Sequence, residues 1–322
     1  MIPSISVIIP SYNGSELLSE NLPSVLESLD GMDRSEIVVV DDHSADHTTA
    51  YLEKNFPQIR IIRNTENLGF ARSVNRGINE ARYDLVFLLN NDIKPEKKYV
   101  TSSLKYFEKA DTFGVMGMIR DARSHEIMEG IKYPVINISG LKYRDIRDPR
   151  IERWTDRMYT FYLCGGNAII NRRKLLELNG LSEIYEPFYQ EDVDLSVRAW
   201  LSGWKLYFNS KAVCYHKHSA TIKKYFEPSY IKSIAKRNRL TLSYIYLTGY
   251  QLTVFNLVTW IKSIYYRLLY VLNFRSVYPG YRDFLKRQKR LNNLKPTSDK
   301  LRDLRSLIAN IRDNIKGNLS KP

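Results

Sequence analysis

Residues 36–46 read EIVVVDDHSAD and place a short apolar run directly before a group of acids. The run at 37–40 is continuous rather than alternating, which is typical of a strand that is covered on both faces of a sheet. Asp41 and Asp42 follow at the end of this strand, and residues 46–56 then have a helical pattern. The stretch therefore predicts one strand-and-helix unit of an α/β fold.

The same order of strand and helix recurs on both sides of this stretch. Apolar runs at residues 5–9, 59–62 and 84–89 alternate with helical patterns at residues 15–29 and 68–82. We therefore predict a doubly wound α/β domain with a mostly parallel sheet flanked by helices. Ligands of such domains bind beyond the carboxyl ends of the strands.

Polar residues follow three of the predicted strands. They read PSYNG at 10–14, DDHSAD at 41–46 and NND at 90–92. Ser44 or Asp46 taken alone would be interpreted as a cap of the next helix. Three acid- or amide-rich strand ends on one edge of a sheet instead predict a ligand site.

The common nucleotide-binding loops are missing from the sequence. It has no GxGxxG after the first strand and no GxxxxGK[ST] at any position. The dinucleotide-binding and P-loop classes therefore lose their main support. A nucleotide bound here would need carboxylates at its base or ribose and a cation at its phosphates.

A second acid-rich stretch lies at residues 188–218. Glu191, Asp192 and Asp194 stand in the first turn of a predicted helix at 191–202, where the helix dipole favours negative charge. Acids at such a position often serve only the helix. Arg198 follows Asp194 by four residues, so we expect these two side chains to form an ion pair.

The remaining part of the domain is less regular. We expect a helix at 96–109, loops with short strands over the active edge at 120–160, and strands at 114–119, 164–170, 205–208 and 212–215. Gly165 and Gly166 open the strand at 164–170, where they permit close approach of a ligand or of a neighbouring strand.

Seven motifs in order resemble those of the family 2 inverting glycosyltransferases with the GT-A fold. They are SVIIPSYNG, VVVDDHSAD, NTENLGFARSVNRGI, LLNNDI, CGGNAIINRRKL, EDVDLSVRAWLSGWKLYF and HKHSAT. The likeness runs from about residue 4 to residue 222. Within the family the chain looks most similar to rhamnosyl- and galactofuranosyl-type transferases that build bacterial surface glycans.

The resemblance implies a role for each matching residue. The residues expected at the donor nucleotide are Pro10, Tyr12, Asn13, Asp41, Asp42, Asn90 and Asn91. Arg72 is a further candidate that could reach a phosphate of the donor, and a solvated helix arginine is the alternative. Asp92 and His216 are expected to hold a divalent metal, Mn²⁺ or Mg²⁺. Asp192 matches the catalytic base, with Glu191 beside it in catalysis and acceptor binding, and Gly165 and Gly166 are expected at the acceptor.

These residue types suit the chemistry that the resemblance implies. A carboxylate can take the proton of the attacking hydroxyl, and a hard cation can neutralise the leaving diphosphate. The chain departs from the family at Asn90, because the family's DxD motif becomes NxD. Asp92 then holds the metal nearly alone unless His216 assists, and we interpret His218 as a surface histidine.

The C-terminal third of the chain has a different composition. Residues 217–322 contain 22 Lys or Arg against five Asp or Glu, whereas the preceding residues are slightly acidic. We predict a catalytic domain at 1–225 and a basic, amphipathic helical region at 226–322 that serves membrane association or oligomerisation. A second amphipathic helix is expected at 299–315, suited to docking or dimerisation.

The pattern at residues 252–274 is a wide apolar face with a narrow polar stripe. That pattern predicts a helix lying in a membrane interface, and the flanking Lys and Arg favour anionic headgroups. Packing on the domain or on a partner subunit, and a true membrane span, are the alternatives. Because the sequence enters a strand at once without a leader pattern, we expect a cytoplasmic protein, peripheral on the inner face of the cell membrane.

These observations together predict a peripheral membrane glycosyltransferase. It would move a sugar from a UDP- or dTDP-linked donor to a glycan or a lipid-linked oligosaccharide in cell-surface polysaccharide synthesis. A nucleotidyltransferase of similar fold is the alternative enzyme. A nucleic-acid-binding protein that uses the basic tail is the other alternative, although no known reader motif supports it and we expect no nucleic-acid partner.

Overall fold

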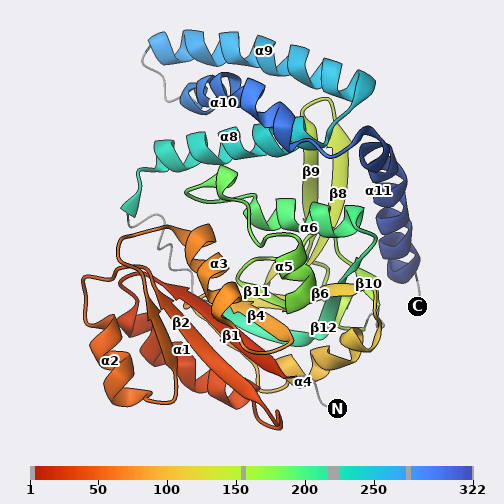
Figure 1. Ribbon diagram of the computed structural model, residues 1–322. Helices are drawn as coiled ribbons and strands as arrows, with labels where there is room; N and C mark the ends of the chain where they lie inside the picture. Colours follow the sequence, from red (N-terminus) through yellow and green to blue (C-terminus); the bar gives the residue numbers. More distant parts are fainter. Residues whose placement is uncertain (1–3, 154–156, 217–224, 273–276, 321–322) are drawn as a thin grey trace.

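The computed structural model describes residues 4–153, 157–216, 225–272 and 277–320 (Figure 1). Its main sheet has the strand order β10-β12-β6-β11-β4-β1-β2-β3, with β5 paired to β12 and β7 to β6. These strands are β1 (Ile5–Ser11), β2 (Ser35–Asp41), β3 (Arg60–Arg63), β4 (Leu85–Leu89), β5 (Ile93–Pro95), β6 (Thr112–Asp121), β7 (Ile127–Glu129), β10 (Met158–Tyr159), β11 (Asn167–Asn171) and β12 (Lys205–His216).

The central part of this sheet is mostly parallel. β1 to β4 pair in parallel, as do β6 and β12, whereas β11 lies antiparallel between β4 and β6. The predicted α/β class is therefore confirmed. β5, β7 and β10 also pair in antiparallel fashion, at the β6 and β12 side of the sheet.

Helices cover both faces of the sheet because its strands are apolar on both sides (Figure 1). Val7 and Ile9 of β1 face one core, with α1 (Ser15–Ser28), α2 (Thr48–Asn55) and α4 (Tyr99–Ser103). Ile8 between them faces the opposite core, with α3 (Phe70–Glu80), α5 (Arg172–Glu177) and α6 (Glu191–Leu201). Successive side chains of β1 thus pack into the two cores on opposite faces of the sheet.

Three of the predicted elements differ from the structure. The helix expected at 96–109 is α4 followed by a 3₁₀ turn at Leu104–Glu108. The two strands expected at 205–208 and 212–215 form the single strand β12, which is irregular between Asn209 and Val213. A bulge of this kind interrupts the side-chain alternation, and so one strand looks like two in the sequence.

The region 120–160 contains a regular hairpin rather than mostly loops. β8 (Ile131–Asn137) pairs in antiparallel fashion with β9 (Gly140–Ile146). The charges in this region suggested loops, but Lys132 is buried and forms ion pairs with Glu129 at 2.9 Å and Asp145 at 3.3 Å. Charge neutralised in this way is compatible with a buried strand.

Four helices follow the main sheet: α8 (Pro228–Tyr246), α9 (Gly249–Val271), α10 (Tyr278–Leu291) and α11 (Ser298–Leu319). α8, α9 and α10 share a small core that includes Leu240, Phe255 and Phe284. α11 joins the core of the main domain instead, through apolar residues such as Ile308 and Ile311. The C-terminal region is therefore packed onto the domain that precedes it.

α9 is the outermost helix (Figure 1), and its exposed residues are mostly apolar. Thr259 and Ser263 of its polar stripe are buried, whereas Trp260 is 57% exposed and Leu268 is 60% exposed. Asn256 of the same stripe accepts a hydrogen bond from the Gln288 amide of α10 at 3.2 Å. Within the described ranges, none of the helices combines the length and the apolar character needed to cross a bilayer.

Candidate active site

Asp192 lies in the first turn of α6, next to Gly165 and Gly166. These glycines form a turn before β11, because the strand predicted at 164–170 begins only at Asn167. Asp192 Oδ2 accepts a hydrogen bond from the Gly165 N–H at 3.4 Å, and its Oδ1 accepts one from the Val193 N–H at 2.8 Å. Burial raises the pKa of Asp192 to about 6, although these two N–H groups lower it. A carboxylate with such a pKa is ionised at neutral pH and is still basic enough to take a proton.

Glu191 precedes Asp192 and is almost fully buried. Burial, followed by the nearby Asp192 carboxylate, raises the pKa of Glu191. Among the described residues, no donor reaches its Oε2. The environment therefore gives the two carboxyl groups different pKa values, and Glu191 holds its proton more tightly than Asp192 does.

Asp194, the third acid of this turn, is fixed by three side chains. Its carboxylate accepts hydrogen bonds from Tyr185 Oη at 3.0 Å and Tyr246 Oη at 2.8 Å, and it pairs with Arg198 Nε at 2.8 Å. The predicted pair of Asp194 and Arg198 is thus confirmed. Tyr246 belongs to α8, so this carboxylate also holds α6 against the C-terminal region.

Asp92 and His216, the two predicted metal ligands, lie together. Asp92 Oδ2 is 3.2 Å from His216 Nε2, because the short strand β5 pairs with the end of β12. The hydrogen bond to Asp92 raises the pKa of His216. Asp92 Oδ1 is buried, and over the described part of the chain it has no hydrogen-bond donor.

This arrangement fits a divalent cation. An unsatisfied carboxylate oxygen beside an imidazole is a donor set that Mn²⁺ accepts, and Mg²⁺ is often held by one or two carboxylates and the phosphates of the ligand. In the described ranges no group of three or more His, Cys, Asp or Glu converges here. Oxygens of the ligand and of water would therefore have to complete the coordination.

The two consecutive glycines connect the loop of Asp92 to the carboxylate of Asp192. Gly166 C=O accepts a hydrogen bond from the Asn90 N–H at 3.1 Å, while the Gly165 N–H donates to Asp192. A Cβ at Gly166 would overlap the Asn90 amide, whereas a Cβ at Gly165 would lie 3.5 Å from Asp192 Cβ. Gly166 thus permits close approach of a neighbouring strand end.

The paired acids at the end of β2 are buried and hydrogen-bonded to the protein. Asp42 accepts hydrogen bonds from the N–H groups of Leu68 at 2.8 Å and Gly69 at 2.9 Å. Asp41 accepts one from the Ser44 N–H at 3.2 Å and lies 3.4 Å from Arg63 Nε. Both carboxylates therefore shape the loops around the predicted nucleotide site.

The first strand end folds against the second. Asn13 adopts a left-handed conformation (φ 48°), and its Oδ1 accepts a hydrogen bond from the Ala45 N–H at 2.8 Å. The ring of Tyr12, two residues after the half-buried Pro10, lies 5.5 Å from the ring of Tyr225. These residues thus form one surface beside Asp41 and Asp42.

Two predicted donor residues have protein partners of their own. The Asn91 amide donates to Ser11 Oγ at 3.0 Å. Arg72 Nε lies 3.0 Å from Glu183 and 2.8 Å from Glu186. His218, interpreted as a surface residue, lies outside the described residues.

The hairpin β8–β9 and the strand before it bring further residues close to Asp192, and the sequence did not indicate them. The ring of Tyr143 lies 4.6 Å from the ring of Tyr162, and burial and the Asp192 carboxylate raise the pKa of Tyr143. Lys132 and Glu129 act on Asp192 in opposite directions, with Lys132 lowering its pKa and Glu129 raising it. In the sequence, only the apolar residues on both sides of Lys132 could have indicated a strand here.

Comparison with known proteins identifies the family. The model described as glycosyl transferase family 2 matches residues 6–178, more than half of the chain. The chain belongs to this family. It is 26% identical over 231 residues to the probable glycosyltransferase YdaM of Bacillus subtilis, covering 69% of this chain and 52% of that protein.

Solved structures share the GT-A fold of this family 2 chain. The mannosyltransferase PcManGT of Pyrobaculum calidifontis, in complex with GDP-Man and Mn²⁺, has a TM-score of 0.56 at 15% identity, covering 99% of this chain and 88% of that one. TarS of S. aureus in complex with UDP-GlcNAc has a TM-score of 0.57 at 14% identity, with 98% and 91% covered. The matches to curated relatives are shorter: this chain covers between about a quarter and about half of the length of four of these proteins.

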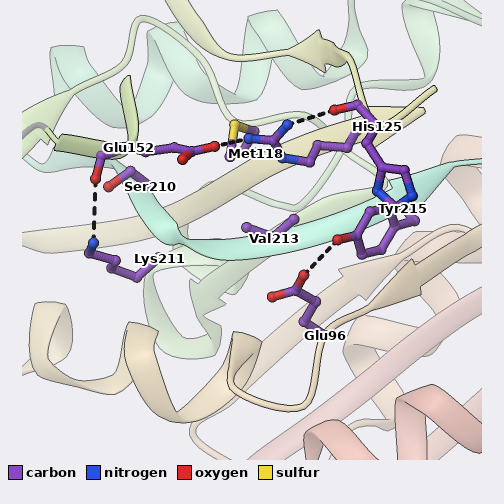
Figure 2. Close-up of a pocket in the computed structure, with 9 residues that line it drawn as sticks. Glu96, Met118, His125, Glu152, Ser210, Lys211, Val213 and Tyr215 are labelled. Carbon is purple, nitrogen blue, oxygen red and sulfur yellow. Dashed lines mark hydrogen bonds and ion pairs between the residues drawn. The ribbon is translucent and has the colours of Figure 1, made fainter. Parts of the chain in front are cut away.

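A separate cavity of about 490 Å³ lies over β6 and β12 of this family 2 chain. Tyr215 lines it and donates to Glu96 at 2.8 Å, and the ring of His125 packs edge-on against Tyr215 (Figure 2). Successive side chains of a strand point to opposite faces, so His216 faces away from this cavity. None of the predicted site residues lines it.

Proposed function

We propose that this protein transfers a sugar from a nucleoside diphosphate sugar to a hydroxyl group of a glycan or of a lipid-linked oligosaccharide. The observation that carries the proposal is the linkage through Gly165 and Gly166. These residues join the Asp92 loop, through Asn90, to the carboxylate of Asp192. A donor diphosphate beside Asp92 and an acceptor hydroxyl beside Asp192 would therefore be held in one site.

The proposed reaction is a single displacement with inversion. The acceptor oxygen bonds to the anomeric carbon as the bond from that carbon to the diphosphate breaks, and the hydroxyl proton passes to Asp192. The raised pKa of Asp192 suits a general base, whereas Glu191 stays protonated and is suited to donate a hydrogen bond to the acceptor. A divalent cation held by Asp92 and His216 would neutralise the charge that develops on the leaving diphosphate.

The donor pocket would be formed by the ends of β1 and β2. Tyr12 offers an aromatic surface for a nucleotide base, while Asp41 and Asp42 fix the loops around the ribose. UDP or dTDP is the proposed carrier, and a rhamnosyl or galactofuranosyl group is the proposed sugar. Solved proteins of the same fold bind GDP-Man and UDP-GlcNAc, which supports a nucleotide sugar without naming this one.

The outward apolar face of α9 supports attachment to a membrane surface. Trp260, Tyr265 and Leu268 are all more than half exposed. Tyr and Trp are favoured at membrane interfaces, and the basic C-terminal region would add attraction to anionic lipids. We propose that the protein attaches to the inner, cytoplasmic face of the cell membrane and acts in cell-surface polysaccharide synthesis.

The test is release of nucleoside diphosphate from a panel of nucleotide sugars, with Mn²⁺ and saccharide acceptors. One donor should support acceptor-dependent release in the wild-type protein, and an Asp192→Asn variant should lose it. Equal release by the wild-type protein and the variant would exclude Asp192 as the base. Release of pyrophosphate from a nucleoside triphosphate would indicate a nucleotidyltransferase instead.

A further inference from the structure

Four basic side chains from three elements converge beside the hairpin β8–β9. They are Lys142 on β9, Lys236 and Arg239 on α8, and Lys262 on α9, here called the cationic cluster. Burial, followed by the nearby Arg239, Lys262 and Lys142, lowers the pKa of Lys236 to about 8. Burial, Arg239 and Lys262 likewise lower the pKa of Lys142. Contacts at the hairpin turn bring the three elements together: the Leu141 N–H donates to Ser243 Oγ of α8 at 3.1 Å, Ser243 Oγ donates to the Arg239 C=O at 2.9 Å, and Lys262 of α9 reaches Ser139 at 3.0 Å. The cations on these elements therefore repel one another.

The contacts around the cluster are neutral. Lys262 Nζ donates to Ser139 Oγ at 3.0 Å, and Lys236 Nζ lies 5.4 Å from the centre of the Tyr281 ring. In the part of the chain that the structure describes, no carboxylate forms an ion pair with any of the four. Assembled cations without a counter-charge are unfavourable, and a bound anion would stabilise them.

The cluster lies directly behind the outward face of α9. Trp260 and Ile261 are 57% and 52% exposed, whereas the next residue, Lys262, is half-buried and turns toward the hairpin. A helix lying in a membrane interface sinks its apolar face about 5–10 Å into the headgroup and acyl boundary. A helix is about 10 Å wide, so the side of α9 that faces the rest of the protein would then lie at the level of the lipid phosphates.

We propose that the cationic cluster binds the phosphate group of a membrane lipid. The proposal rests on the membrane attachment proposed above and names the group that is recognised there. Lys142 immediately precedes Tyr143, whose pKa responds to the Asp192 carboxylate. β9 therefore runs from Lys142 of the cluster to Tyr143 near the proposed base, with these two side chains on opposite faces of the hairpin.

A second copy of the chain fits the same surface less well. Residues 217–322 contain 22 basic residues against five acidic ones, so two such surfaces placed face to face would repel each other. The exposed face of α9 also includes Tyr265 and Tyr270 next to aliphatic residues, a mixture favoured at the membrane–water interface. Charge and composition thus both favour an anionic lipid surface.

The test is flotation of the full-length protein with phosphatidylcholine vesicles, with and without phosphatidylglycerol. A Lys236→Gln/Lys262→Gln variant should bind the phosphatidylglycerol vesicles about tenfold more weakly, since each basic residue near the surface contributes measurably to binding. A Lys236→Arg/Lys262→Arg variant should retain binding. Lys300→Gln/Lys316→Gln on α11 is the matched control, with the same loss of charge and a change of less than about twofold.

Three results would overturn the proposal. One is an equal loss of vesicle binding in the cluster variant and the control, which would mean that only diffuse charge matters. Another is competition by inorganic phosphate without any binding to vesicles, which would indicate a soluble ligand. The third is a protein that does not bind vesicles but dimerises with increasing concentration in sedimentation experiments, with the dimer abolished by Trp260→Glu.

Flotation does not depend on catalysis, so it separates this inference from the proposed function. Nucleoside diphosphate release with a soluble acceptor should be the same in the cluster variant and the wild-type protein. A wild-type protein that floats but releases no diphosphate would contradict only the proposed function. Equal melting curves by circular dichroism would show that the cluster variant is folded.

Discussion

Asp92 Oδ2 lies 3.2 Å from His216 Nε2, although 124 positions of sequence separate the two residues. The pairing of β5 with β12 produces this contact, and the second oxygen of Asp92 stays without a donor among the described residues. A buried carboxylate that is only half satisfied is unfavourable unless another positive partner is present. The geometry therefore favours a cation at this strand end.

Replacing Asp92 should weaken metal binding. We expect Asp92→Asn to bind Mn²⁺ at least about tenfold more weakly, because the charged oxygen that faces the cation is lost. Asn90→Asp should act in the opposite direction, since it restores a second carboxylate. Mn²⁺ titration followed by electron paramagnetic resonance measures both effects, and equal affinities in all three proteins would contradict the assignment.

Replacing the proposed base should affect the chemical step. Asp192→Asn should lower kcat about 10²- to 10⁴-fold with little change in the KM of the donor, because a general base contributes about that much. Glu191→Gln is the isosteric comparison and should lose less, since the Glu191 carboxyl is already protonated. Steady-state diphosphate release gives both values, and a larger loss for Glu191→Gln would reverse the two roles.

The pH dependence follows from the raised pKa of Asp192. Only the ionised carboxylate accepts a proton, so kcat/KM should rise about tenfold per pH unit up to a midpoint near 6 and then level off. The folded protein binds this proton more tightly than the unfolded chain, so the contribution of Asp192 to stability falls as pH rises from its ordinary pKa to about 6. Asp192→Asn should therefore lack the acidic limb and be more stable at pH 7, which thermal melting would measure.

The two glycines should differ in their tolerance of a methyl group. Gly166→Ala should lower activity at least about tenfold, because its Cβ would push the Asn90 amide and the Asp92 loop out of place. Gly165→Ala is the matched control, since its Cβ would meet Asp192 and Phe70 at ordinary contact distances of 3.5 Å and more. Equal activities of the two variants would mean that the approach of Gly166 to Asn90 is unimportant.

The two sides of α9 should respond differently to substitution. Trp260→Ser/Leu268→Ser should reduce flotation with vesicles and leave thermal stability nearly unchanged, because both side chains are exposed. Phe255→Ala on the inner side should instead destabilise the protein by about 3–5 kcal/mol, since its ring fills the core of α8 to α10. Strong destabilisation by the outer pair would show that this face is packed rather than free.

Much of the fold could be predicted from local pattern. The strands at the start of the chain are continuous apolar runs, and their pattern does not depend on distant residues. β12 was harder, because the irregularity between Asn209 and Val213 makes one strand look like two. The hairpin β8–β9 was missed because the charge of Lys132 suggested exposure, and only the folded chain shows Glu129 and Asp145 beside it.

The candidate site was predictable in its residue types but not in their partners. Asp92 was indicated by its place after a strand, whereas the proposed roles of Asp192 and His216 came from the family resemblance. The sequence could not show that Arg72 pairs with Glu183 and Glu186, since that contact depends on the tertiary path of the chain. For the same reason the cationic cluster, which unites Lys142 with residues about a hundred positions later, had no local signature.

The hydrogen bond from Tyr246 to Asp194 has a practical consequence for dividing the chain. A version cut after residue 225 would lose this hydroxyl, and it would lose the buried Asn238, whose amide holds the Phe188 and Tyr189 carbonyls ahead of α6. It would also lose α11 from the main core. The C-terminal third therefore holds α6 and the residues before it in position. Tests of membrane binding should substitute single exposed residues rather than remove this region.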